Sequence, residues 1–207
     1  MKFNSRVLGL TLALGLLASA SSHAMVGVSL VGAGTFSAPD VKDTNGITVP
    51  YKSKLGLGGG GLVDIWFAHR TSLEVGVLYL KAKQEATISG FDTTTEFTVI
   101  QVPILVRFHL MRYLSIGVGG YVAREQGDVA YTATSGGTTT SGTSAYTNTK
   151  TDYGAEASLG LKIPMGMMSS ILIDGRYIYG MKDLDPSING KVNTRAFQLL
   201  AGLHFGF

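Results

Sequence analysis

The chain has 207 residues, 45% of them hydrophobic and only 15% charged, with a formal net charge of +3 and no cysteine. The lack of cysteine excludes a disulfide framework and a cysteine-linked lipid anchor. Lysines and arginines are scattered and form no basic run, which argues against a nucleic-acid partner. After the N-terminal segment no apolar run is long enough for a membrane helix, so the chain is either a β-rich soluble core or a membrane β-barrel.

The N-terminal segment has the organisation of a secretory signal peptide. Lys2 and Arg6 precede an apolar run of about 13 residues ending at Ala20, which is too short to cross a bilayer as a helix. Small residues allow cleavage after Ala24 or after Ala20. We therefore expect residues 1–24 to be a signal peptide and residues 25–207 to be one mature domain. The alternative is a short buried helix or a membrane anchor.

From residue 26 onward, apolar residues alternate with small or polar ones in eight segments, as in strands with one apolar face. In chain order the segments are residues 26–36, 54–67, one that starts near 72, 97–110, 114–122, 153–163, 171–179 and 196–207. The connections alternate long and short, and the longest, roughly 126–152, is rich in Thr, Ser and Gly. This pattern predicts an all-β, eight-stranded antiparallel up-and-down barrel that crosses a membrane, with both ends on the periplasmic side.

Aromatic residues of the apolar phase gather at two heights, as expected for the two interfaces of a membrane. One set lies near the long loops and comprises Phe36, Tyr79, Tyr153, Tyr177, Tyr179 and Phe197. The other lies near the short turns and comprises Phe67, Phe108, Phe205 and Phe207. We expect these rings to form two girdles around an apolar outer wall.

Three stretches resemble small outer-membrane barrels of the OmpA/OmpX type: V-P-I-L-V-R-F from residue 102, G-V-G-G-Y from 117 and D-G-R-Y-I-Y-G from 174. The last strand is similar to the closing strand of that family, whose terminal aromatic is read by the barrel-assembly machinery. The resemblance implies a monomer in the bacterial outer membrane that contacts lipid and lipopolysaccharide. It also implies an assembly signal formed by Phe197, Leu199, Leu203, Phe205 and Phe207.

Charged residues of both signs fall in the inward phase, and an eight-stranded barrel is only just wide enough for side chains to fill. They are Asp64, Glu74, Arg107, Glu156, Lys162, Asp174 and Arg176. Folding neighbouring strands brings Glu74 roughly opposite Arg107, and Lys162 within a diagonal of Asp174. Because buried charges must be paired, we expect a salt-bridged polar plug. A proton or ion path is the alternative.

Other motifs give only weak indications of a functional site. The glycines of residues 56–61 are followed by a strand rather than by Gly-Lys-Ser/Thr or a helix, so they indicate strand bending and no phosphate loop. His69, His109 and His204 have no metal-ligand spacing, and we interpret them as structural rather than catalytic. Trp66 takes the inward phase, and Pro103 in mid-strand predicts a bulge.

These patterns predict no cofactor, no metal and no enzyme activity. The expected role is envelope structure or surface contact through extracellular loops, because function in this architecture resides in the loops. The alternatives are a narrow solute channel, which needs an open lumen, and a lipid-modifying hydrolase, which needs a Ser/His/acid cluster on the outer wall.

Overall fold

The computed structural model describes residues 25–43, 51–88, 91–135, 138–144, 151–182 and 190–206. The predicted signal peptide and Phe207 lie outside these residues. The strands are β1 (Val26–Asp43), β2 (Tyr51–Ala68), β3 (Thr71–Ile88), β4 (Phe91–His109), β5 (Leu114–Ser135), β6 (Thr138–Ser144), β7 (Thr151–Pro164), β8 (Ser169–Gly180) and β9 (Gly190–Gly206). No helix in the described part of the chain is long and apolar enough to cross a membrane.

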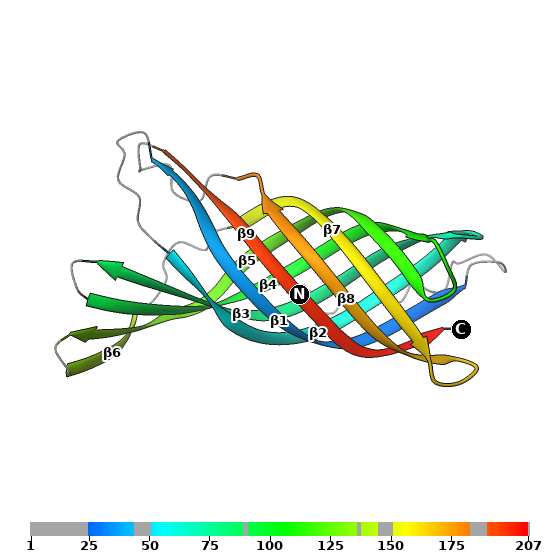
Figure 1. Ribbon diagram of the computed structural model, residues 1–207, viewed down its shortest axis with the longest axis horizontal. Helices are drawn as coiled ribbons and strands as arrows, with labels where there is room; N and C mark the ends of the chain where they lie inside the picture. The colour runs from blue at the N-terminus through cyan, green and yellow to red at the C-terminus, as the bar shows by residue number, and fades with distance from the viewer. Residues whose placement is uncertain are drawn as a thin grey trace, which may run out of the picture.

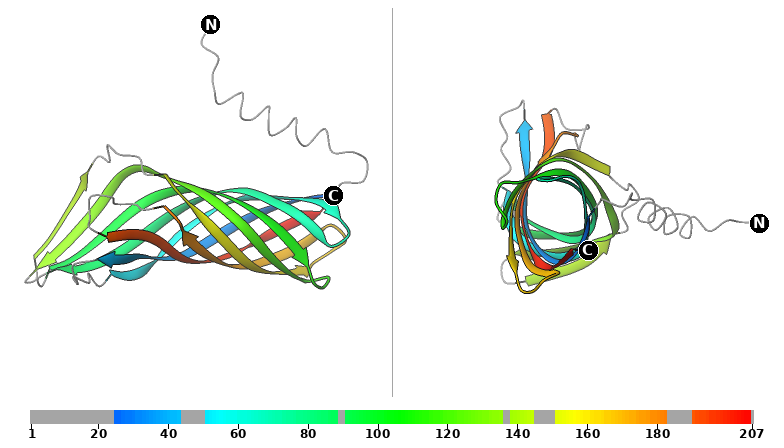
Figure 2. Two further views of the ribbon diagram at one scale, coloured as in Figure 1. Left: turned by 90° about the horizontal axis from the view of Figure 1, so that it is seen from above. Right: turned by 90° about the vertical axis from the view of Figure 1, so that its right-hand side faces the viewer.

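Eight of the strands close into a barrel (Figures 1 and 2). Each of β1–β5 and β7–β9 pairs antiparallel with its neighbours, and β1 pairs with β9 from Gly27↔Gly206 to Asp43↔Gly190. Closure pairs the backbone groups that an open sheet edge would expose to lipid. The predicted eight-stranded up-and-down barrel is therefore confirmed.

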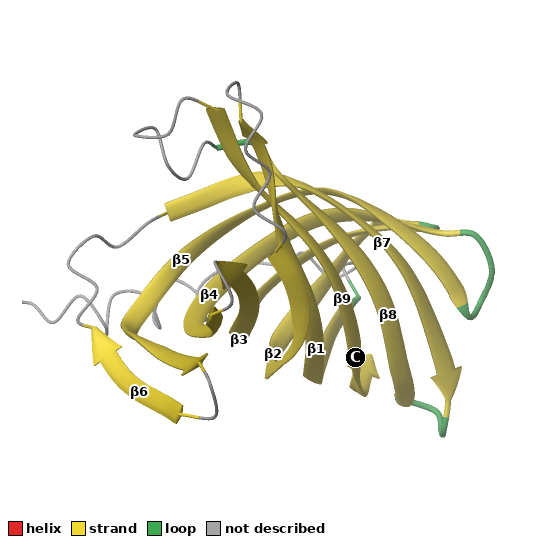
Figure 3. Ribbon diagram, turned by 60° about the vertical axis from the view of Figure 1, so that its left-hand side comes forward, coloured by secondary structure: helices red, strands yellow, loops and turns green. Residues whose placement is uncertain are grey.

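The barrel has two unlike ends. At one, which we call the turn end, short connections join β2 to β3, β4 to β5 and β7 to β8, and the β9 terminus lies beside β1 (Figure 2). At the other, which we call the hairpin end, strands continue past the barrel and β6 pairs with the last part of β5 (Figure 3).

The structure of the hairpin end shows that the prediction of a long loop over residues 126–152 is wrong. β5 continues to Ser135, and its residues 129–135 pair with residues 138–144 of β6. Likewise β1 runs to Asp43, well into the segment expected to be a polar loop. In sequence these extensions are rich in Thr, Ser and Ala and lack the long run of alternating large apolar residues that marks the barrel strands. Threonine, a β-branched residue, nevertheless favours extended backbone.

The alternation of buried and exposed side chains follows the predicted phases. In β8 the side chains of Leu172, Asp174 and Arg176 are buried inside the barrel, whereas Ile171 and Ile173 on the other face are exposed. The same two-residue period runs through the other barrel strands. The outer wall is consequently a continuous apolar surface, which suits lipid rather than water.

Pro103 produces no bulge, contrary to the prediction. β4 keeps one register with β5 from Thr98↔Gln126 to His109↔Ser115. Its pairing with β3 lapses opposite Pro103 and resumes in the same register at Leu78↔Gln101. A proline removes one donor but adds no residue, so a ladder bond is lost without a shift. The register shifts lie elsewhere, between Lys54 and Gly58, Trp66 and Ala68, and Glu96 and Thr98.

The glycines of residues 56–61 lie inside β2, paired with β1 on one side and, from Gly58, with β3 on the other. A Cβ atom at Gly58 or Gly60 would collide with the backbone of β3. The glycines therefore permit close approach of backbones in a narrow barrel. No phosphate-binding loop exists at this position.

Candidate functional site in the lumen

Two arginines lie at the centre of the lumen, fully buried (0% exposed). Arg107 on β4 uses its whole guanidinium: Nε donates to Glu74 Oε2 at 2.7 Å, Nη1 donates to Ser115 Oγ at 3.3 Å, and Nη2 pairs with Asp174. The expected Glu74–Arg107 contact is thus present. It joins neighbouring strands, as the sequence pattern implies.

Arg176 on β8 makes a second set of ion pairs. Its Nη2 donates to Glu74 Oε1 and to Asp174 Oδ2, both at 2.8 Å, and its Nη1 donates to Glu156 Oε1 at 2.9 Å. Glu74 therefore bridges the two arginines through its two oxygens, and Asp174 pairs with both. We call these five residues the charge cluster; its two positive and three negative charges sum to −1.

The charge cluster ties together walls of the barrel that are distant in the chain. It joins β3, β4, β7 and β8, and hydrogen bonds extend it to β9. Gln101 donates to Glu156 at 3.1 Å, and Gln198 donates to Gln101 at 2.8 Å. A charge in this setting is stable only while its partners remain, because taking it out of water costs several kcal/mol. Removing any one of these charges would therefore leave each of its buried partners in the lumen with one ion pair fewer.

A second polar group lies towards the turn end, and it corrects one predicted contact. Lys162 Nζ pairs with Asp64 Oδ2 at 3.0 Å, across the lumen on β2, rather than with Asp174. The carboxylate of Asp174 is already engaged by both arginines. His204 completes the group: its Nδ1 is hydrogen bonded to Ser29 Oγ at 2.9 Å, and its Nε2 lies 3.4 Å from Lys162 Nζ.

Trp66 stacks on His109 near the turn-end mouth of the lumen, with ring centroids 3.9 Å apart and planes inclined by 22°. Ser72 Oγ is hydrogen bonded to His109 Nε2 at 3.1 Å. This stack explains why a tryptophan takes the inward phase: its ring lies against an aromatic partner instead of the lipid interface. His69 lies apart, exposed in the turn after β2.

Neither Ser–His pair has the geometry of a catalytic triad. A triad acid bonds the imidazole nitrogen opposite the one that faces the serine. Asp64 lies 3.7 Å from Nδ1 of His204, the nitrogen that already faces Ser29. No described carboxylate bonds to His109. Both pairs also lie inside the barrel, whereas the hydrolase hypothesis needs a cluster on the outer wall.

No group of three His, Cys, Asp or Glu side chains in the described ranges is placed to hold a metal ion. The serines Ser29 and Ser72 and the Trp66–His109 stack were not identified from the sequence. Their inward strand phase was a usable signal for the serines. Their partners depend on contacts across the lumen.

The lumen is less polar than predicted, because leucines fill much of it. A buried apolar cluster comprises Val31, Ala33, Leu62, Leu78, Leu80, Leu172 and Leu200. A second cluster, nearer the hairpin end, packs Tyr121 against Ala123, Ile178 and Ala196. The hydroxyl of Tyr121 donates to Asp152 Oδ2 at 2.7 Å. Charged and apolar side chains together therefore occupy the interior.

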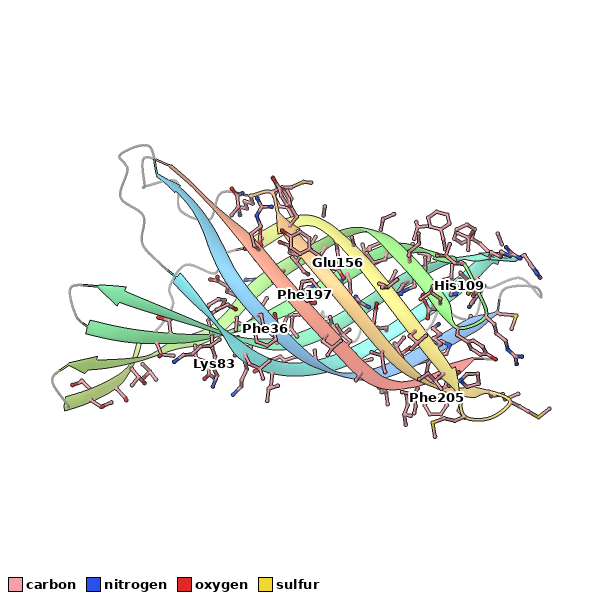
Figure 4. The ribbon with its side chains drawn as sticks, viewed as in Figure 1. Phe36, Lys83, His109, Glu156, Phe197 and Phe205 are labelled. Carbon is pink, nitrogen blue, oxygen red and sulfur yellow. The ribbon has the colours of Figure 1, made fainter. Side chains whose placement is uncertain are left out.

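The outer wall carries the expected aromatic rings (Figure 4). Those near the hairpin end are 42–58% exposed, and Phe36, Phe197 and Tyr177 lie side by side in register across β1, β9 and β8. Near the turn end Phe67, Phe108 and Phe205 are also exposed. The β9 residues of the predicted assembly signal, Phe197, Leu199, Leu203 and Phe205, all face outward; Phe207 lies outside the described residues.

Comparison with known proteins agrees with this architecture. Residues 11–185 match the family described as "Outer membrane protein beta-barrel domain". The chain belongs to this family. It is therefore a protein of the bacterial outer membrane, in agreement with its apolar outer wall and closed sheet.

A solved structure shows the same fold as this outer-membrane barrel. The outer membrane protein OprG from Pseudomonas aeruginosa is similar over 88% of this chain and 95% of its own, with a TM-score of 0.59 and 10% identity. Ail of Yersinia pestis and Neisserial surface protein A align over 88% of this chain and 99% and 97% of theirs, each at 16% identity, with TM-scores of 0.46 and 0.45. No curated protein sequence matches the chain.

Proposed function

We propose that this protein is a non-conducting, non-enzymatic barrel that acts in the envelope through its hairpin end, which faces the outside of the cell. The observation that supports this proposal most strongly is the filled lumen. Arg107 and Arg176 are fully buried at its centre, and each is fixed by carboxylates from more than one strand. A solute would have to separate several mutually paired buried charges to pass, at a cost of several kcal/mol for each ion left buried without its partner.

The hairpin end supports a surface-contact role. Tyr79 lies in the aromatic girdle, yet β3 continues beyond it to Ile88 and pairs there with β4. β4 pairs in turn with β5, and β5 with β6, so the wall extends as a sheet past the membrane. Thr139, Thr140 and Ser141 of β6 are all exposed, with successive side chains on opposite faces of the strand, and each carries a hydroxyl group; that of Ser141 is hydrogen bonded to Thr132 Oγ1 at 3.3 Å. Such a surface suits contacts made by hydrogen bonds.

Planar-bilayer recording of the purified mature protein tests the filled lumen. We expect no conductance steps under conditions in which an open porin, reconstituted in parallel, conducts. Reproducible steps from the wild-type barrel would favour the narrow channel instead.

Orientation is tested with single cysteines, because the chain has none of its own. Thr140→Cys on β6 should react with a membrane-impermeant maleimide on intact cells. Met167→Cys, in the fully exposed turn between β7 and β8, should react only after the outer membrane is permeabilised. The reverse pattern would place the hairpin end in the periplasm.

Deletion of β6 tests the contact role. This strand pairs with β5 outside the barrel, so its loss leaves the closing pairs of the barrel intact. Cells that carry the shortened protein should keep normal amounts of folded barrel but adhere less to surfaces or to one another. Unchanged adhesion would leave a structural envelope role as the function.

A further inference from the structure

Cationic side chains gather on the outer wall of β3–β5, just beyond the aromatic girdle at the hairpin end. The strand registers place Tyr79, Ile100 and Arg124 in one row across the three strands. In the next rows towards the hairpin end lie Lys81 and then Lys83, which is paired with Glu96. All these side chains have the outward phase of their strands. Their height corresponds to the headgroup region of a membrane whose interface is marked by the girdle.

The two lysines share one carboxylate and remain accessible. Lys81 Nζ lies 3.5 Å from Glu96 Oε1, and Lys83 Nζ lies 2.9 Å from Glu96 Oε2. Their side chains are 53% and 39% exposed. Arg124 is exposed and makes no ion pair with any described residue. Three positive charges and one negative charge sum to +2, so Glu96 positions the lysines without neutralising them.

The wall below this patch is apolar. Val77, Ile104 and Val122 lie on the same three strands towards the middle of the barrel and are 55%, 47% and 49% exposed. The opposite wall differs. There Arg195 stacks over the ring of Tyr179, with its guanidinium carbon 3.7 Å from the centroid. The wall formed by β3–β5 thus joins an apolar strip to several accessible cations.

We propose that this outer wall of β3–β5 binds a glycolipid whose sugar headgroup carries a phosphate at each end, as lipid A does. Lys81 and Lys83 contact one phosphate, and Arg124 contacts the other. β3 and β5 are separated by two strand spacings, about 10 Å, so two separate phosphates fit better than one phosphodiester. The acyl chains lie along Val77, Ile104 and Val122. The inference rests on the outward orientation of the hairpin end, because this lipid occupies the outer leaflet.

Native mass spectrometry of the purified mature barrel in detergent, titrated with lipid A, tests the proposal without depending on orientation. Wild type should retain one lipid A in preference to phosphatidylglycerol, which has a single phosphodiester, and to dephosphorylated lipid A. Each cation near a charged membrane contributes about a five-fold change in binding. Lys81→Gln/Arg124→Gln should therefore weaken lipid A binding about 25-fold, whereas Glu96→Gln should strengthen it severalfold.

The matched control removes two positive charges from the turn end. Arg70→Gln/Arg112→Gln changes two exposed residues and the net charge by the same amount, and it should leave lipid A binding unchanged. Heat-modified gel mobility checks that every variant is folded. Equal weakening by the control, or equal retention of phosphatidylglycerol or dephosphorylated lipid A by the wild type, would overturn the assignment. Failure of the cysteine-labelling test with lipid A binding intact would overturn only the orientation.

Discussion

The lumen and the outer wall use similar ion pairs for opposite purposes. In the lumen Glu74 bridges Arg107 and Arg176, and all three side chains are at most 1% exposed. On the outer wall Glu96 bridges Lys81 and Lys83, whose side chains are 53% and 39% exposed. Although in the lumen Asp174 and Glu156 bind the arginines as well, one carboxylate contacts two cations at both sites. Their surroundings decide whether the site holds the barrel together or remains available to a ligand.

The physical difference is the cost of leaving a charge without its partner. A buried ion that loses its partner keeps its desolvation penalty, and the loss typically destabilises a protein by about 3–5 kcal/mol. An exposed ion is rehydrated, and pairs of this kind contribute about 0–1 kcal/mol. Arginine also suits the lumen because its planar fork can engage several carboxylates at once, whereas lysine presents a single mobile ammonium group.

The largest effect is expected for Arg176→Met. This change leaves Glu74, Glu156 and Asp174 with one guanidinium, that of Arg107, among three buried carboxylates. The free energy of unfolding should fall by about 3–5 kcal/mol, measured by urea titration in detergent. A loss below about 1 kcal/mol would mean that the lumen tolerates unpaired charge as the outer wall does.

A double-mutant cycle on Glu74 and Arg107 comes next. Arg107→Met and Glu74→Gln should each destabilise the barrel, and the double variant should recover part of the loss. We expect an interaction free energy of roughly 0.5–3 kcal/mol, because the 2.7 Å contact is removed by either change. Additive losses would show that the two residues are energetically independent despite their proximity.

Lys162→Met should have an intermediate effect, since this residue is between the two extremes in exposure. Its side chain is 13% exposed, whereas that of its partner Asp64 is 2% exposed. Removing the ammonium group leaves the buried carboxylate of Asp64 without its ion-pair partner and with His204 Nδ1 3.7 Å away, at a cost of about 1–3 kcal/mol. The same urea titration measures it. Asp64→Asn/Lys162→Met should be more stable than Lys162→Met alone; a further loss would contradict the pairing.

The smallest effect is expected for Glu96→Gln, the matched counterpart of Glu74→Gln. Stability should change by less than about 1 kcal/mol, because both lysines are rehydrated. Both changes replace a carboxylate that bridges two cations with a neutral amide, so the difference between their unfolding free energies compares a buried site with an accessible one. Similar losses at both sites would remove the distinction between structural and accessible ion pairs.

The contacts across the lumen show where sequence reasoning stops. Glu74 and Arg107 were predicted to meet because β3 and β4 are adjacent in sequence, and folding them about their connection brings the two residues roughly opposite each other. Arg176 reaches Glu74 from β8, and Lys162 reaches Asp64 from β7 to β2. Those pairs depend on how far each strand is staggered around the closed barrel. Local alternation carries no information about that stagger.

The polar extensions were missed for a related reason. Within the membrane, lipid requires apolar side chains on one face, so each barrel strand carries a two-residue period that can be read directly. β6 pairs with the outer part of β5 beyond the closed barrel, where no lipid-facing apolar phase is required, and its residues are Thr, Ser and Gly. Only the backbone pairing between β5 and β6 identifies these residues as strands.

The sequence by itself determined the strand phases, the count of eight barrel strands, the two aromatic heights and the inward position of all seven lumen charges. It could do so because lipid and lumen impose opposite polarity on alternate residues. Only the tertiary structure decided that Glu74 and Asp174 each pair with both arginines, that Lys162 pairs with Asp64, and that leucines share the interior. These contacts follow from closure of the barrel, which places side chains from non-adjacent strands within a few ångströms of one another.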